Sequence, residues 1–254
     1  MICSRNATPG RRFVVAACTM FVAAACGGTV PQQGDSAAAT VPAAETTGTG
    51  QHAGWETLFD GSTLGGWRGY RRDDTPAAWQ VEDGALAFVP GSGDGGDIIT
   101  RDQYADFELE IEWRVAPAAN SGIFYRATEE TGRIYENATE MQVLDNAGHA
   151  DGRSPLTSAG SNFGLYAVEQ DVTRPVGEWN SARIVARGAH IEHWLNGHRV
   201  VVFEQGGDDW KARVAASKFA AWPAYGQSFT GHIGLQDHGD RVWFRNIRIR
   251  RLDP

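Results

Sequence analysis

Hydrophobic and polar residues alternate along most of the chain after residue 54, which is the pattern of β-strands with one buried face. The clearest stretch is 107–115, where Phe, Leu, Ile, Trp and Val alternate with Glu and Arg. Such a strand has one face in the core and the other in water. Similar short runs occur at 81–89, 122–126, 140–144, 182–186, 232–235 and 242–249.

A β-hairpin is predicted where segments 191–195 and 198–203 flank the dipeptide Asn196-Gly197. Asn-Gly is favoured in two-residue type I′ turns, which join antiparallel strands. Three histidines fall on this hairpin, and we expect their side chains at the surface; the alternative is that His193 and His198 chelate a metal. They are His190, His193 and His198.

Helical spacing is confined to 208–220, where Trp210 and Val214 are four residues apart and Asp208 is positioned as an N-cap. No other segment shows this period. Many short strands with hardly any helix predict an all-β fold, a two-sheet sandwich with at most one or two short helices.

The first 25 residues have the pattern of a bacterial export signal. Three arginines precede the apolar run 13–25, which is too short to span a bilayer comfortably. Three alanines then precede Cys26, which resembles a lipobox, so we expect lipidation at Cys26 and a periplasmic or cell-surface protein. One alternative is the run Val15-Ala16-Ala17-Cys18, which fits the lipobox pattern better but leaves a very short apolar region. The other is ordinary signal-peptidase cleavage near Ala25, which gives a soluble exported protein.

Residues 26–53 are dominated by Gly, Pro, Gln, Ser, Ala and Thr. Such a composition cannot bury enough apolar surface to offset the entropy of ordering, so we expect a flexible tether. The folded domain is then predicted over 54–254, and the membrane is reached only through the N-terminal lipid.

Composition excludes some classes of partner and site for the domain. The net charge is −8, which disfavours nucleic acid and anionic lipid as partners. All three cysteines lie at or before position 26, so the domain has neither disulfides nor a cysteine-based zinc site. Nine tryptophans are many for 254 residues. Tryptophans in such number either pack in the core or provide surfaces on which sugars stack.

Polar residues occur at positions that a plain sandwich does not require. Glu140 and Gln142 share one face of a predicted strand and can reach one ligand, or form a solvated edge. Asp237 is positioned to orient His238, or both bind a metal, or the segment is a simple turn. Arg126 at a strand end suits a substrate oxygen or an ion pair.

Short motifs follow one another along residues 54–252. In order they are WETLFDG (55–61), GW (66–67), DI (97–98), DFEL (106–109), NSGIFYR (120–126), EMQVLDN (140–146), GEWN (177–180), WLNG (194–197), GLQDHG (234–239) and VWFRNI (242–247). Together they resemble the bacterial 3-keto-disaccharide hydrolase family, formerly a domain of unknown function. Pattern alone identifies no catalytic signature.

The resemblance implies a concanavalin A-like jelly roll and cleavage of 3-keto-disaccharides or 3-keto-glucosides, by hydrolysis or by a lyase route. It also implies a pathway partner, an upstream sugar 3-dehydrogenase. A ketone at C3 acidifies the hydrogen at C2, and loss of that proton expels the oxygen at C1. The rival hypotheses are a non-catalytic carbohydrate-binding surface lipoprotein and an adhesion or scaffold protein.

Each candidate residue has an expected role in that reaction. The base is His238 oriented by Asp237, or Glu140, and Arg126 and Lys218 polarise the keto oxygen or bind hydroxyls. A divalent metal (Mn, Zn or Ca) held by Glu140, His238 and His149 is the alternative. The residues expected to hold the sugar are Ser121, Gln142, Asp145, Asn146, His149, Gln236 and Trp222.

Overall fold

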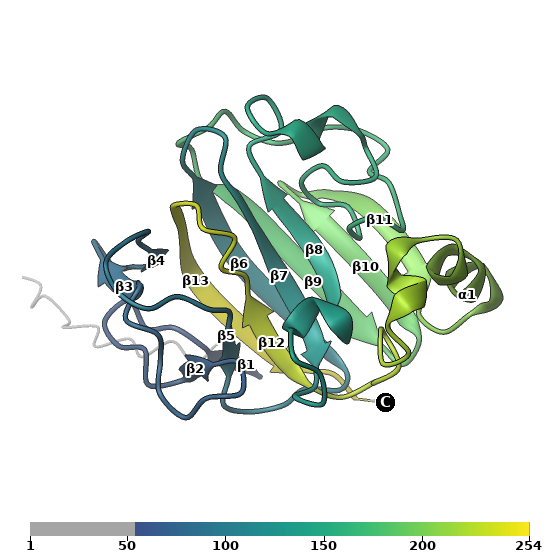
Figure 1. Cartoon of the computed structure of the whole chain (residues 1–254), viewed down its shortest axis with the longest axis horizontal. Coiled ribbons are helices and arrows are strands. Elements are labelled where there is room, and N and C mark those ends of the chain that lie inside the picture. Colours follow the sequence, from purple (N-terminus) through teal and green to yellow (C-terminus); the bar gives the residue numbers. More distant parts are fainter. Residues whose placement is uncertain (1–53, 254) are drawn as a thin grey trace, which may run out of the picture. The chain divides into compact units, whose positions relative to one another are not determined.

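Two antiparallel sheets stack face to face in the computed structural model, which describes residues 54–253 (Figure 1). The eight-stranded sheet contains β1 (Trp55–Thr57), β3 (Trp79–Glu82), β4 (Ala85–Phe88), β6 (Phe107–Val115), β9 (Asn180–Arg187), β10 (His190–Leu195), β11 (His198–Glu204) and β13 (Val242–Arg251). The five-stranded sheet contains β2 (Trp67–Gly69), β5 (Ile98–Thr100), β7 (Asn120–Ala127), β8 (Thr139–Leu144) and β12 (His232–Leu235). The predicted all-β sandwich is confirmed.

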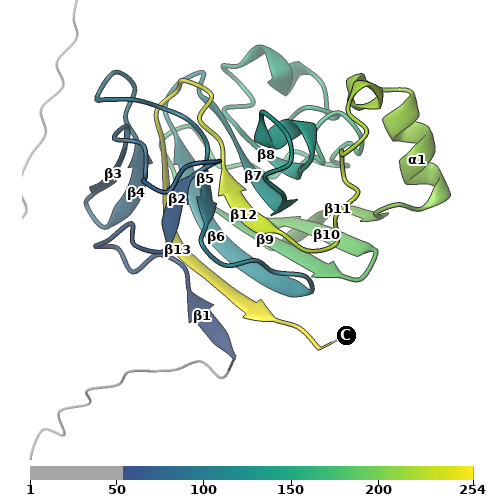
Figure 2. The ribbon, with the colours of Figure 1, turned by 60° about the horizontal axis from the view of Figure 1, so that its bottom comes forward.

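Strands far apart in the sequence are neighbours in both sheets. The large sheet has the order β11-β10-β9-β6-β13-β4-β3, with β1 paired to β13, and the small sheet has the order β2-β5-β12-β7-β8. Figure 2 shows the small sheet lying across the large one. This arrangement brings segments near residues 97, 122, 140 and 236 onto adjacent strands or strand ends.

Helical structure is short and peripheral. The one α-helix of the described chain, α1 (Asp208–Ala215), begins after an N-cap at Gly207, so the predicted capping by Asp208 is wrong. The rest of the predicted helix is a separate 3₁₀ turn, η3 (Lys218–Ala221), which Ser217 caps. Two further 3₁₀ turns are η1 (Ile134–Glu136) and η2 (Ala150–Arg153). None of these helices is long and apolar enough to cross a membrane.

The core lies between the sheets and follows from the alternation. In β6 the apolar residues at 107, 109, 111, 113 and 115 are all buried, as predicted. Four of the nine tryptophans are also fully buried, so core packing is their role; these are Trp67, Trp79, Trp113 and Trp210. The other five lie partly exposed.

One predicted hairpin is confirmed, and one predicted continuous strand is interrupted by a turn. The hairpin β10–β11 is confirmed, with φ of 49° at Asn196 and 83° at Gly197, as a type I′ turn requires. The predicted single strand 81–89 is wrong because Asp83 and Gly84, with φ of 48° and 76°, reverse the chain between β3 and β4. Asp-Gly is also a type I′ dipeptide.

His193 is buried, which corrects its predicted surface position. Its Nε2 lies 2.8 Å from the Tyr125 hydroxyl and its Nδ1 lies 3.1 Å from the Gly160 carbonyl. Burial lowers the pKa of His193 to about 4, so the ring is neutral at pH 7. A neutral ring donates from Nδ1 to the carbonyl and accepts from Tyr125, which ties the two sheets together. His190 and His198 are partly or fully exposed.

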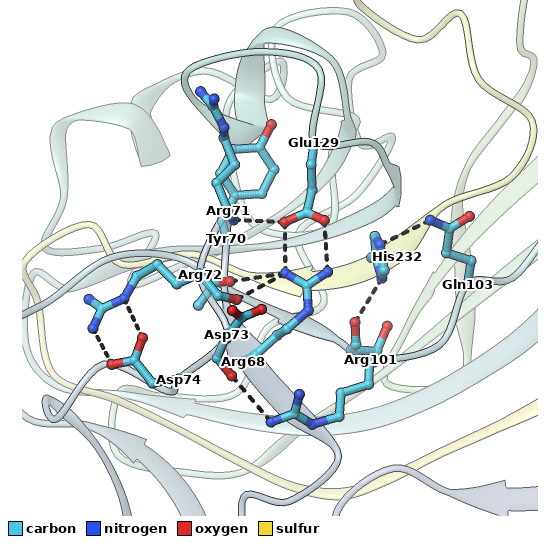
Figure 3. A network of polar contacts seen from close by, with 12 residues as sticks. Arg68, Tyr70, Arg71, Arg72, Asp73, Asp74, Arg101, Gln103, Glu129 and His232 are labelled. Carbon is cyan, nitrogen blue, oxygen red and sulfur yellow. Dashed lines mark hydrogen bonds and ion pairs between the residues drawn. The ribbon is translucent and has the colours of Figure 1, made fainter.

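A paired network of charges fixes edge strand β2 to the loop after β7 (Figure 3). The Arg68 guanidinium donates two hydrogen bonds of 2.7 Å to the Glu129 carboxylate, and the backbone of Arg71 donates a third. Arg72 pairs with Asp74 and Asp94 in the same region. These ion pairs join β2 and the segment that follows it to the loop after β7 and to the loop before β5, so the network stabilises the positions of these loops.

The bond between Tyr125 and His193 gives a test of the core. Replacing Tyr125 with Phe leaves a buried nitrogen without a donor, and we expect the free energy of unfolding to fall by about 1–3 kcal/mol. Urea denaturation measures this. The control is Tyr135→Phe, since the Tyr135 hydroxyl makes no hydrogen bond within residues 54–253. Equal stability of the two variants would contradict the assigned bond.

Candidate active site

Alternation in β8 sends Glu140 and Gln142 to the outer face of the five-stranded sheet, while Met141 and Val143 enter the core. The sequence prediction that Glu140 and Gln142 share a face is therefore confirmed. Both line a cavity of about 150 Å³. Its wall consists of Asn120, Tyr135, Glu140, Gln142, Asp151, Phe163, Lys218, Gln236 and His238.

Several separate segments build this wall. The adjacent strands β7 and β8 form its floor, and η1 contributes Tyr135. The long connection from β8 to β9 contributes Asp151 and Phe163, and η3 contributes Lys218. The segment between β12 and β13 supplies the amide of Gln236 and the imidazole of His238. The floor is rigid sheet and the rim is loop, as is common for binding sites.

Gly122 on β7 makes room for the Glu140 carboxyl group. A Cβ at position 122 would lie 2.1 Å from Glu140 Oε1 and 2.8 Å from its carboxyl carbon. The carboxyl group therefore lies directly over the neighbouring strand, where any larger residue would collide with it. Glycine at this position is required by close approach, since its φ is not positive.

Burial controls the proton on Glu140, which is only 7% exposed. Removal from water raises the pKa of Glu140 to about 8, because the charged form loses solvation. The positive charge of Lys218 opposes this rise, whereas Asp97 and Asp151 add to it. Glu140 is therefore mostly protonated at neutral pH and available as a proton donor.

A second shifted carboxyl group, Asp97, precedes β5 on the same face. Burial raises the pKa of Asp97 to about 7, although its oxygen accepts a 2.9 Å hydrogen bond from the backbone of Asp237. The carboxylate of Asp237 adds to the rise by repulsion. The sequence prediction placed Asp97 only within a motif and gave it no role, because an acid before a strand carries no sign of its burial.

Two amide side chains give the cavity its hydrogen-bonding capacity. Gln236 Oε1 is buried and has no partner within the described residues. Gln142 fits its surroundings with the amide nitrogen donating to the Ser121 carbonyl at 3.1 Å and to Glu140 Oε1 at 3.2 Å. A buried acceptor without a donor is uncommon in proteins and suits a site that receives a hydroxyl-rich ligand.

Known proteins agree with this fold and sequence. Residues 54–250 match the model of the 3-keto-alpha-glucoside-1,2-lyase-like domain. The chain belongs to this family. It is 40% identical over 230 residues, 79% of each chain, to a 3-keto-disaccharide hydrolase of Bacteroides thetaiotaomicron.

Solved structures agree as well. A candidate glycosyl hydrolase from Parabacteroides distasonis superposes with a TM-score of 0.72 at 33% identity, covering 79% of this chain and 94% of that one. A second structure from the same organism gives a TM-score of 0.62 at 31% identity, covering 78% and 99%. The family resemblance drawn from the ordered motifs is confirmed.

Within this family fold, Arg126 does not reach the site, which corrects its predicted role. The pairing of β7 with β12 shifts register near Arg126, whose φ is 54°, and this bulge turns the side chain away. The guanidinium is buried, donating to Gln205 Oε1 at 2.8 Å and to the Ala105 carbonyl at 3.0 Å. It is a buried structural group, which differs from both the substrate contact and the surface ion pair considered for it.

Three residues expected to hold the sugar instead hold the backbone. The Ser121 hydroxyl donates to the Gln236 carbonyl at 2.8 Å. Asp145 accepts from the backbone N–H groups of residues 118, 147 and 148, and Asn146 accepts from that of residue 159. None of the three lines the cavity. They fix the strands and the loop that carry the residues at the rim.

The predicted orientation of His238 by Asp237 is wrong. Both Asp237 oxygens accept backbone N–H bonds, from Gly96 at 2.7 Å and from Gly239 at 2.8 Å. The carboxylate nearest to His238 is that of Asp240, whose Oδ2 lies 3.7 Å from Nδ1. His238 itself is at the cavity, about half exposed.

His149 and Trp222 flank the cavity without lining it. The two rings of His149 and His238 have centroids 6.1 Å apart, but His149 Nδ1 accepts the N–H of Asp151. Trp222 packs against Tyr135, with centroids 5.4 Å apart. No group of three or more His, Cys, Asp or Glu side chains within residues 54–253 is arranged to hold a metal, so Glu140, His238 and His149 do not form a ligand set.

Sequence reasoning missed the roles of Asn120, Tyr135 and Phe163 in the cavity wall. Asn120 could have been identified from the sequence, because it begins the NSGIFYR motif two residues before Gly122. No sequence feature distinguishes Tyr135 and Phe163 as cavity residues, since aromatic residues in loops usually cover the core. For the glycine-rich segment with His149 and Asp151, the sequence allowed either a cleft lining or no role, and Asp151 lines the cavity.

The shifted carboxyl groups predict how stability depends on pH. Between pH about 4.5 and 8 the folded chain keeps the Glu140 proton that the unfolded chain releases, so the free energy of unfolding falls as pH rises. Asp97 acts in the same direction between about 3.8 and 7. In Glu140→Gln the fall should be smaller by a few kcal/mol, as measured by urea denaturation at pH 5 to 9.

The matched control for this test is Glu169→Gln, an exposed glutamate far along the β8–β9 connection. We expect its stability to follow that of the unmodified chain at each pH. A Glu140→Gln chain with the same pH dependence as this control would contradict a buried, protonated Glu140.

Proposed function

We propose that this protein cleaves the glycosidic bond of 3-keto-disaccharides or 3-keto-glucosides by proton abstraction at C2. Family membership and the 3-keto-disaccharide hydrolase relative support this activity. The observation that carries the proposal is Glu140, a buried and protonated acid in a small polar cavity beside His238 and Lys218.

The reaction balances without an added cofactor. A base removes the C2 proton, and the electron pair moves to the C3 carbonyl to give an enediolate. Its collapse forms the C1–C2 double bond and breaks the bond from C1 to the glycosidic oxygen, which takes a proton and leaves as an alcohol. Water then adds its oxygen at C1 and a proton at C2, so the net change is hydrolysis to a 3-keto sugar.

Each step has a residue of suitable chemistry. Glu140 donates its proton to the leaving oxygen, and His238 takes the C2 proton, since imidazole is the commonest general base in proteins. The Lys218 ammonium stabilises the enediolate oxygen. Gln142, Gln236 and Asn120 bind hydroxyl groups of the sugar. No step passes through a metal, because the candidate ligands are not assembled in the described residues.

The N-terminal segment lies outside the described residues, and its role is part of the proposal. Export by the signal at 1–25 and lipidation at Cys26 would place the enzyme in the periplasm or at the cell surface. There it would receive its keto-sugar from a separate oxidation at C3, catalysed by a sugar 3-dehydrogenase.

Product analysis tests the activity. The full chain, incubated with 3-keto-trehalose, 3-keto-sucrose and a 3-keto-β-glucoside, should release a 3-keto sugar and an alcohol, detected by NMR. Glu140→Gln and His238→Ala should each lower kcat by about 10²–10⁴-fold, as expected for the loss of a proton-transfer group. His198→Ala, an exposed histidine on the β10–β11 hairpin, is the control. Binding of these sugars without any product would identify a binding module instead.

Isotopic labelling tests the route through C2. Deuterium at C2 of the substrate should slow turnover by a primary isotope effect, because that bond breaks in the first step. The control is the same sugar deuterated at C4, which takes no part. Product formed at equal rates from both would contradict abstraction at C2 while leaving cleavage itself intact.

A further inference from the structure

The outer face of the eight-stranded sheet, away from the candidate active site, contains a hollow of about 550 Å³. This volume is larger than that of the active-site cavity and is typical of small-molecule sites. Strands β1, β6, β9 and β13 and two turns surround it. Its lining consists of Thr57, Phe59, Asp60, Gly61, Gly84, Glu110, Ile111, Glu112, Ser181, Asn246, Ile247 and Arg248.

Two of the three carboxylates in this hollow are paired with arginines. Glu110 accepts from Arg248 at 2.8 Å, and Glu112 accepts from Arg245 at 2.7 Å. Asp60 accepts the backbone N–H groups that follow it in its own turn. With Glu110 and Glu112 paired and Asp60 without a cationic partner in the described residues, the hollow is slightly negative, which disfavours an anionic ligand.

Three neutral hydrogen-bonding side chains in the hollow have no protein partner within residues 54–253. They are the exposed side chains of Thr57, Ser181 and Asn246. Asn246 lies where β13 shifts its register against β6, and its φ is 51°. Such a bulge directs a side chain away from the regular ladder, here into the hollow. Free hydroxyl and amide groups beside neutralised charges suit a ligand rich in hydroxyl groups.

A partly exposed tryptophan stands at either side of the hollow. Trp55 lies two residues before Thr57 in β1, and Trp179 lies two residues before Ser181, so each shares a face with its hydroxyl neighbour. Arg248 lies 4.6 Å from the Trp55 ring and Arg245 lies 4.1 Å from the Trp179 ring. Arg250 and Arg114 also lie over these two rings, at 4.9 Å and 4.8 Å. These cation–π contacts fix the indoles, and the part of each ring that the guanidinium groups leave exposed is a stacking surface for the apolar face of a sugar.

We propose that this outer face binds a neutral glycan chain, with Trp55 and Trp179 as stacking surfaces and Thr57, Ser181 and Asn246 as hydrogen-bonding groups. The site is separate from the cavity around Glu140 and does not depend on the proposed cleavage reaction. Trp55 in β1 and Trp179 directly before β9 have β13 and β6 between them, a separation that favours a ligand of more than one sugar unit.

Affinity gel electrophoresis of the full chain tests this proposal. The probes are soluble starch, dextran, a mixed-linkage β-glucan and xylan, with polygalacturonate as the charged comparison. We expect at least one neutral polysaccharide to retard the chain and polygalacturonate to have no effect. Retardation constants should weaken about five- to ten-fold in the double variant Thr57→Val, Ser181→Ala, which keeps side-chain shape while removing two hydroxyl groups.

A tryptophan pair provides the second comparison. Trp55→Ala should weaken retardation, whereas Trp194→Ala should not, although Trp194 lies on the same sheet and stacks with Arg183 at 4.0 Å. Thermal melting tests whether each variant is folded. If Trp55→Ala does not fold, the double variant Thr57→Val, Ser181→Ala alone tests the proposed glycan site.

Three results would overturn the proposal. These are no retardation by any neutral polysaccharide, equal retardation of the double variant and the unmodified chain, and light scattering that shows a dimer which Trp55→Ala converts to a monomer. The last result would assign this face to contact between copies of the chain.

Discussion

The candidate site depends on one close approach, that of the Glu140 carboxyl group on β8 to Gly122 on β7. The carboxyl group occupies the space that any other side chain at position 122 would fill. Backbone pairing holds the two strands in a fixed register, in which Glu140 is opposite Phe124 and Gly122 is its diagonal neighbour. The space left by Gly122 lets the carboxyl group lie buried over the neighbouring strand, and this burial raises its pKa.

Burying a carboxyl group is unfavourable unless it is neutralised or well bonded. Here Glu140 keeps its proton instead of pairing closely with a cation, and Asp97 shows the same response nearby. A buried acid whose pKa lies near the working pH is poised to transfer a proton, which a surface carboxylate would rarely do. The same desolvation that weakens the fold at high pH therefore prepares the site for chemistry.

Sequence reasoning succeeded where a local period fixes the structure. Alternation predicted β6 and the two outward residues of β8, and Asn196-Gly197 predicted the β10–β11 turn. The prediction was wrong at 81–89, because the Asp83-Gly84 dipeptide, which is as typical of a two-residue turn as Asn-Gly, was not recognised as one. The ordered motifs identified the family, because their number and spacing exceed what any single pattern provides.

The roles of single residues were harder to predict because they depend on long-range pairing. Arg126 and Asp237 stand beside true cavity residues in sequence, yet a bulge turns one away and backbone N–H groups occupy the other. The local pattern predicts His193 at the surface of a hairpin, whereas in the fold Tyr125 and Gly160 satisfy both of its nitrogens. Burial of this kind is set by the opposite sheet, which a local pattern does not contain.

The most direct test is the titration of Glu140 itself, followed by carbon NMR in chains labelled at the glutamate carboxyl carbon and assigned by comparison with Glu140→Gln. One carboxyl signal, absent from Glu140→Gln, should titrate near pH 8, well above the exposed glutamates. A Glu140 signal that titrates near the ordinary value of 4.5 would contradict the buried acid on which this account of the site depends.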